Sequence, residues 1–206
     1  MSLTVVGLAV LHVVRRELSP VRDRLSEYAN GSYGSIMTAS FVTLGAGAIV
    51  LGLAMLSTGR TTGWSRVVPV AVIVAGCGLI VSGVFPTDPT GAPTTAERIH
   101  SLASGSASLA LIAAAVVSAR GALARQPGRP RGPAVVLAGL ALGLGAISPV
   151  LHGSRWTGLS QRTLWLTLTT WLLVTAWQLR SGHAVERAPA AMEVVGRRAD
   201  TIERCS

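Results

Sequence analysis

Four long stretches of this chain contain no charged residue, and they limit its fold more than any other feature. They cover residues 35–57, 67–85, 101–119 and 133–151. An apolar run of about 18 or more residues can cross the roughly 30 Å hydrocarbon core of a bilayer as a helix. Half of all residues are hydrophobic and only 13% are charged. The sequence therefore predicts an all-α, polytopic membrane protein.

Two further segments complete a predicted bundle of six transmembrane helices. Residues 163–179 are short for a span and rich in Thr and Trp, but they carry no charge. Residues 3–14, with their neighbours, reach about 21 Å at 1.5 Å per residue. This first segment lacks the basic start and the small-residue cleavage site of a signal peptide, so we interpret it as a short, retained helix. The prediction is one transmembrane domain over residues 1–180 and a mobile or amphipathic cytoplasmic tail over residues 181–206.

The net charge of +9 comes entirely from arginine, because none of the 18 basic residues is lysine. In a membrane protein this charge is explained by topology and by contact with anionic lipid head groups, so lipids are the expected partners and nucleic acid is not. The two cysteines, Cys77 and Cys205, have no partner at metal-site spacing. We therefore predict no cofactor, no structural metal and no disulfide framework.

The arginines also predict an orientation. With six helices, eleven of the 18 arginines lie on the side of the two termini. Arginine in short loops stays on the cytoplasmic side, so the prediction is a multi-pass protein of the cell membrane with both termini inside. The outer loops then hold five of the nine acidic residues and two of the four histidines. Loops on a rigid scaffold often carry function, although solvated loops of this composition are also common.

The second outer loop, "VFPTDPTGAPTTAERIH", stops one helix and starts the next. Pro86 and Pro89 flank Asp88, and a residue before proline is driven away from helical angles. The preceding helix is therefore expected to end at Phe85. Asp88 is predicted to lie on a stiff turn at the mouth of the bundle.

The following helix is predicted to begin with a capping box made by Thr94 and Glu97. His100 comes three residues after Glu97, on the same side of the helix. An interfacial histidine is usually solvated or bonded to a carbonyl. Ionisable groups that face a bundle interior are costly and often functional, however, and histidine suits proton transfer near neutral pH.

Packing expectations follow from the helices themselves. Two pairs of small residues, Gly139 with Gly143 and Ala48 with Gly52, are expected to let helices approach closely. On the last helix, a polar face is predicted to point into the bundle and a leucine face to meet lipid. The polar face contains Thr163, Thr167, Thr170 and Gln178 with Trp171 beside them, and the leucine face contains Leu164, Leu168 and Leu172.

Three motifs resemble the family of bacterial six-helix membrane proteins known as domain of unknown function 998. They are S-P-V-R-D-x-L-S-E-Y at residues 19–28, T-D-P at residues 87–89 followed eleven residues later by His100, and "GLSQR" at residues 158–162. The resemblance covers roughly residues 1 to 180 and implies fold and membrane location without an established reaction. The chain departs from the family in its short first helix and in the added pair Arg16 and Glu17.

The polar residues of the outer loops predict a pocket at the extracytoplasmic mouth. The predicted catalytic residues are Asp88, His100 and Glu27. The predicted substrate-binding residues are Arg162, His152, Tyr28, Gln161 and Trp171. The reaction favoured is acid–base chemistry of the cyclase or isomerase type on a polyprenyl, a lipid or a hydrophobic peptide. No H-x-x-x-H or H-E-x-x-H pair occurs, which disfavours a metal mechanism.

Two other classes of function remain open. The first is a non-enzymatic protein that binds, senses or transports a lipid or small molecule, and the second is a structural or assembly partner. Homo-oligomerisation is a further alternative. Charged residues are absent from the centres of the predicted helices after the first. This absence disfavours a proton relay across the membrane and favours a pocket open to one side.

Overall fold

The computed structural model describes residues 2–57, 66–87, 94–125 and 132–204. Over these ranges the chain is helical and has no β-strand, which confirms the predicted all-α class. The elements are α1 (Ser2–Val14), the 3-10 helix η1 (Leu25–Ala29), α2 (Gly34–Ser57), α3 (Val67–Val84), α4 (Thr95–Arg125), α5 (Gly132–Leu151) and α6 (Thr157–Arg204).

Four of the described helices are long and apolar enough to cross a membrane. These spans are Gly34–Ser57, Val67–Val84, Thr95–Arg120 and Pro133–Leu151. The apolar part of α1, Thr4–Val14, is shorter. The protein is therefore a multi-pass membrane protein, while the crossings assigned to α1 and α6 stay predictions.

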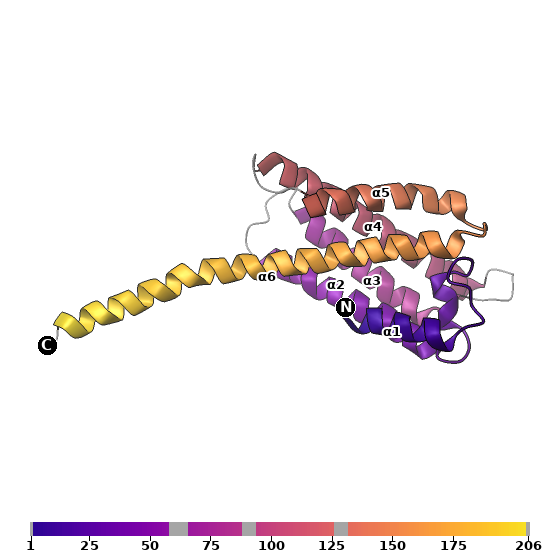
Figure 1. The fold of residues 1–206 in the computed structure, drawn as a ribbon, viewed down its shortest axis with the longest axis horizontal. Coiled ribbons are helices and arrows are strands. Elements are labelled where there is room, and N and C mark those ends of the chain that lie inside the picture. Colours follow the sequence, from indigo (N-terminus) through magenta and orange to yellow (C-terminus); the bar gives the residue numbers. More distant parts are fainter. Residues whose placement is uncertain (1, 58–65, 88–93, 126–131, 205–206) are drawn as a thin grey trace. The chain divides into compact units, whose positions relative to one another are not determined.

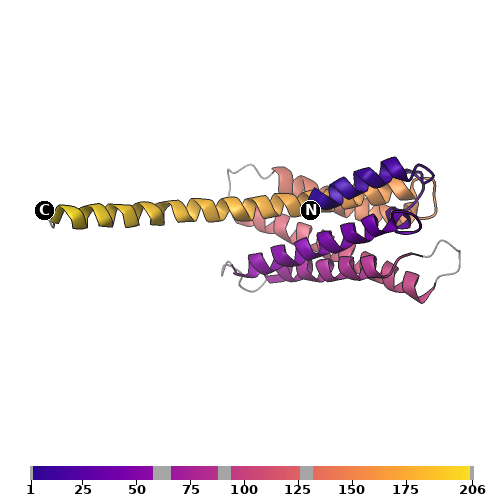
Figure 2. The ribbon, with the colours of Figure 1, turned by 90° about the horizontal axis from the view of Figure 1, so that it is seen from below.

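The chain separates into two compact units, Met1–Leu172 and Leu173–Ser206. The boundary falls inside α6, and the predicted boundary at residue 180 stays a prediction. In the first unit, α2 packs against α1 and α3, and α4 packs against α3 and α5 (Figures 1 and 2). The short η1 lies against α2.

Glycine brings α2 and α3 into backbone contact. A Cβ added to Gly45 would lie 2.6 Å from the carbonyl oxygen of Gly76, and a Cβ on Gly76 would lie 2.6 Å from the oxygen of Gly45. Only residues without a side chain permit this approach, which is how membrane helices gain packing contacts without a hydrophobic driving force.

The two predicted small-residue pairs behave differently. Ala48 is fully buried, and a Cβ on Gly52 would lie 2.8 Å from the oxygen of Pro69, so this pair is confirmed as part of the α2–α3 contact. A Cβ on Gly139 or Gly143 would meet no atom within 4 Å. The prediction that these two glycines allow a close approach is therefore wrong within this chain.

The predicted orientation of α6 is also wrong. Leu164, Leu168 and Leu172 are buried, whereas Thr163, Thr167 and Thr170 are only partly buried; of the residues predicted to point inward, Trp171 is buried. The three threonine hydroxyls donate to the carbonyls of Leu159, Thr163 and Leu166, at 2.8 to 2.9 Å. A hydroxyl that is bonded to its own helix needs no partner in the bundle, so leucine packing decides which face is buried.

Candidate functional site

Hydrogen bonds join the first outer loop to the second at one end of the bundle. Nη2 of Arg24 lies 3.5 Å from Oε1 of Glu97, at the start of α4. Nδ2 of Asn30 donates to Oγ1 of Thr87 at 3.3 Å, and this hydroxyl donates to the carbonyl of Ser26 at 3.3 Å. The two loops therefore share one rim, as the sequence predicted.

The start of α6 is bound to the same first loop. The amide of Leu159 donates to the carbonyl of Val21 at 3.1 Å. The amide of Leu25 donates to Oε1 of Gln161 at 2.6 Å. The third outer loop, which leads into α6, therefore lies at the same end of the bundle as the first loop (Figure 1).

Gly158 and Arg162 complete this contact. A Cβ on Gly158 would lie 2.4 Å from the carbonyl oxygen of Asp23 and 2.9 Å from that of Pro20. Nη1 of Arg162 donates to the same Asp23 carbonyl at 2.7 Å. The "SPVRD" and "GLSQR" motifs thus dock onto each other, and each motif has a structural reason for its residues.

Arg15 holds the first loop onto the end of α1. Its guanidinium donates to the carboxylate of Glu17 and to the carbonyls of Asn30 and Ser32. The hydrogen bond from Arg15 lowers the pKa of Glu17 below its usual value. The carboxylate of Glu17, which departs from the family pattern, therefore pairs with Arg15.

The turn from α3 to α4 follows the sequence prediction where it is described. The α3 helix ends at Val84 with Phe85 as its cap. Oγ1 of Thr94 accepts a hydrogen bond from the amide of Glu97 at 3.3 Å, which is one half of the predicted capping box. Asp88, one of the three predicted catalytic residues, lies outside the described residues.

A cleft of about 570 Å³ opens between α4, α5 and α6 beneath this rim. On α4 its wall carries Ser101, Ser104 and Ser108. Its apolar lining includes Leu109, Ile112, Leu164 and Trp165. Its size lies within the roughly 300–1,000 Å³ of small-molecule sites, and it offers both hydrocarbon and hydroxyl groups to a ligand.

His100 lines this cleft and is only 3% exposed. Its Nδ1 lies 2.8 Å from the carbonyl oxygen of Ser82 and 2.9 Å from that of Phe85. Because both partners are acceptors, Nδ1 must carry a proton, which leaves Nε2 as the nitrogen available to a ligand. The edge of the ring meets Phe41, with ring centroids 5.9 Å apart. The end of α3 thus fixes both the tautomer and the orientation of His100.

His152 and Gln161 line the same cleft. His152 is exposed, after the end of α5. Oε1 of Gln161 is bonded to the amide of Leu25, so its amide nitrogen is the group left for a ligand. The structure thus brings three of the predicted site residues to one cavity.

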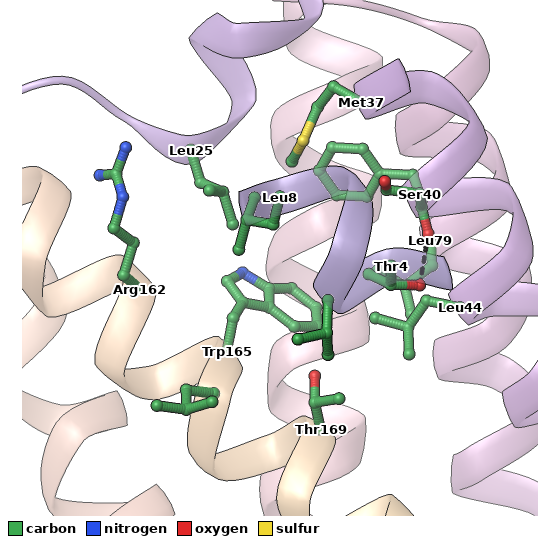
Figure 3. Close-up of a pocket in the computed structure, with 13 residues that line it drawn as sticks. Thr4, Leu8, Leu25, Met37, Ser40, Leu44, Leu79, Arg162, Trp165 and Thr169 are labelled. Atoms are coloured by element: carbon green, nitrogen blue, oxygen red, sulfur yellow. Dashed lines mark hydrogen bonds between the residues drawn. The ribbon is translucent and has the colours of Figure 1, made fainter. Parts of the chain in front are cut away.

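Arg162 belongs to a second cavity of about 110 Å³ with mainly apolar walls, drawn in Figure 3. Trp165 lines both cavities. In Figure 3 the guanidinium of Arg162 points away from Leu8 and Trp165. Arg162 and His100, which were predicted to share one pocket, therefore line different cavities.

The guanidinium of Arg162 is held by His12 and Tyr28. Its Nε donates to Nε2 of His12 at 3.1 Å, and its Cζ lies 5.3 Å from the centre of the Tyr28 ring. The His12 and Tyr28 rings stack with centroids 5.1 Å apart. His12 was not among the site residues predicted from the sequence. The available signal was an ionisable side chain inside an otherwise apolar helix.

The remaining predicted residues that the structure describes do not line the cleft. Glu27 pairs with Arg24 at 2.9 Å. Trp171 is buried farther along α6 and is not among the residues that line either cavity. Among the described residues, no three His, Cys, Asp or Glu side chains come together as a metal site.

Comparison with known proteins agrees with the motifs. Residues 2–178 match the family described as protein of unknown function (DUF998). No curated protein and no solved structure matches the chain. The family match covers the six-helix region, including all three outer loops. This multi-pass helical membrane protein belongs to the DUF998 family.

Proposed function

We propose that this protein is a membrane enzyme that performs acid–base chemistry on a lipophilic substrate in the cleft, with His100 as the proton-transferring group. The observation that carries the proposal is the fixed tautomer of His100, whose Nδ1 is held by two carbonyls. Nε2 is then a preoriented lone pair in a cavity with hydrocarbon walls. Such a geometry suits a general base.

The reaction class that fits is isomerisation or cyclisation. Nε2 takes a proton from one atom of the substrate, the substrate's double bond shifts, and the imidazolium returns the proton to another atom. The number of protons and electrons is unchanged, so this reaction needs no oxidant, reductant or co-substrate. The apolar side chains of Ile112 and Leu164 support a hydrocarbon substrate in the same cleft.

A second candidate is a protein that binds a lipophilic molecule without changing it. The described residues that line the cleft include no carboxylate. Among the described lining residues, His152 is therefore the other group, besides His100, that could act as an acid or base. Binding alone needs no such second group.

The test uses a strain without the gene, complemented with variants of His100. His100→Asn keeps an amide that can donate to the carbonyls at the end of α3 but removes Nε2. Ser106→Ala is the matched control, because Ser106 is exposed on α4 and bonded to the carbonyl of Ala103. Cellular lipids are compared by mass spectrometry.

If the proposal is right, His100→Asn inserts and folds normally but slows conversion of the accumulating lipid by about 10²- to 10⁴-fold. The Ser106→Ala strain matches the wild type. Full conversion by a folded His100→Asn protein rules out His100 as the base. A lipid that copurifies with the wild type but is never converted favours the binding function.

We further propose that the protein resides in the cell membrane with both termini in the cytoplasm. The support is the excess of arginine on the side of the termini, eleven of 18. The cleft, together with the rim of the three outer loops, then opens towards the extracytoplasmic side.

A further inference from the structure

We infer that the molecule bound in the cleft has an uncharged polar end that carries hydroxyl or carbonyl groups, in place of a phosphate or carboxylate. The inference rests on the proposed function, because it assigns the ligand class of the same cleft. It follows from the charges and the hydrogen-bonding groups of the described lining.

The cleft offers no free permanent cation among its described residues. Arg24 is the one arginine in that lining, and its guanidinium lies 2.9 Å from Glu27 and 3.5 Å from Glu97. This cluster of one cation and two carboxylates carries a net charge of 1 − 2 = −1. The charge of Arg24 is thus already balanced by two carboxylates, and both carboxylates would repel an anionic head group.

Neutral hydrogen-bonding groups are plentiful, and one of them has no protein partner. The hydroxyl of Ser108 donates to the carbonyl of Ser104 at 2.9 Å, so its remaining lone pairs can only accept. Oγ of Ser148, on the α5 wall, is buried and makes no hydrogen bond. Buried hydroxyls almost always have a partner, so Ser148 is the group that a ligand is expected to satisfy.

Proline adds an acceptor beside Ser148. Pro149 lies inside α5 and has no amide proton, so it cannot donate to the carbonyl of Gly145 one turn earlier. Both residues line the cleft together with Ser148. In a membrane such a helix is tolerated where the released carbonyl meets a polar cavity.

The chemistry of a hydroxyl matches these walls. A ligand hydroxyl accepts from Ser148 or from the amide nitrogen of Gln161, and it donates to Nε2 of His100 or to the carbonyl of Gly145. The apolar lining takes the hydrocarbon part. The cleft therefore fits a neutral lipid such as an isoprenoid alcohol or a diacylglycerol.

The experiment compares probes that differ only in their polar end. The full-length protein in lipid nanodiscs is titrated with geranylgeraniol against geranylgeranyl phosphate, and with dioleoylglycerol against dioleoylphosphatidic acid, with occupancy read by native mass spectrometry. We expect the neutral member to bind at least tenfold more tightly in one or both pairs. Ser148→Ala should weaken that binding by about 3- to 10-fold, the loss of one hydrogen bond, and Ser106→Ala should not.

The outcomes separate the two proposals. Equal or tighter binding of the anionic member, still weakened by Ser148→Ala and His100→Asn, overturns the neutral head group and leaves the cleft as the site. Binding that neither substitution affects places the lipid elsewhere and overturns the proposed function as well. If no probe binds the folded protein, the neutral-lipid inference is wrong.

Discussion

Gly158 shows how much of this site depends on single residues. Its hydrogen atom faces the carbonyl of Asp23, at a distance where no side chain fits. The same carbonyl accepts from Arg162, whose Nε is bonded to His12. One glycine and one arginine thus bind α6 to the first loop and to α1.

We expect Gly158→Ala to destabilise the protein by about 1–3 kcal/mol, because its Cβ would overlap a backbone oxygen and force the loop away. The measurement is thermal unfolding of the purified protein in detergent. Gly139→Ala is the control, since nothing lies within 4 Å of its Cβ and alanine favours the helix. Equal melting temperatures for the two variants would contradict the docking of the loop.

Arg162→Lys should also be destabilising, by about 1.5–3 kcal/mol, although the charge is kept. Arg162 bonds His12 from Nε and the Asp23 carbonyl from Nη1, and a lysine, whose donors share one nitrogen, cannot reproduce this spacing. Arg155→Lys is the matched control, because Arg155 is exposed and lies over Trp156. The two melting temperatures are compared, and a similar small change in both argues against a structural role for Arg162.

At the scale of elements, glycine brings the backbones of α2 and α3 into contact, whereas Gly145 of α5 approaches only the side chain of Ile112. The Gly45–Gly76 contact leaves no space for a methyl group on either helix, whereas the Gly139 and Gly143 positions are open. The α5 span is also only 11% buried. The pair α2 and α3 is therefore more closely packed than α5, and the end of α3 bonds to His100.

Gly76→Ala should lower stability by about 1–3 kcal/mol, and Gly45→Ala should do the same, because each methyl group meets the opposite carbonyl. The double variant should cost less than the sum, since the first methyl group already separates the helices. Unfolding in detergent measures all three. Gly143→Ala should have little effect in the monomer. If it changes the oligomeric state in cross-linking, α5 forms the contact of a homo-oligomer.

For the whole molecule, the gathering of all three outer loops at one rim decides whether a site exists. Contacts from Arg24 to Glu97 and from Leu25 to Gln161 join segments far apart in sequence. Because of this rim, the cleft opens at one end of the bundle.

Accessibility labelling tests the orientation of this rim. In a Cys77→Ser/Cys205→Ser background, Ser32→Cys and Trp156→Cys should react with a membrane-impermeant thiol reagent in intact cells. Ser57→Cys, at the opposite end of α2, should react only after permeabilisation. Reaction of Ser32→Cys and Trp156→Cys from opposite sides would contradict the shared rim, and the reverse pattern for all three would place the termini outside.

The sequence alone predicted the four long spans, the end of α3, the cap of α4 and the membrane environment, whereas the last helix, predicted over residues 163–179, runs over Thr157–Arg204. Long uncharged runs predict spans because hydrocarbon thickness sets a minimum length. The end of α3 at Phe85 and the cap at Thr94 follow from backbone chemistry that acts within a few residues. The sequence also predicted that the outer loops meet. Two membrane crossings separate one outer loop from the next, so the chain returns to the same side.

Only the tertiary structure decided which polar residues share a cavity. His100, His152 and Gln161 line the cleft, whereas Arg162 lines the other cavity. The buried face of α6 was likewise beyond sequence reasoning, because a threonine hydroxyl satisfied by its own helix is nearly neutral towards lipid or protein. Both outcomes depend on how side chains from distant segments fill the space between helices, and hydropathy, spacing and capping do not encode that arrangement.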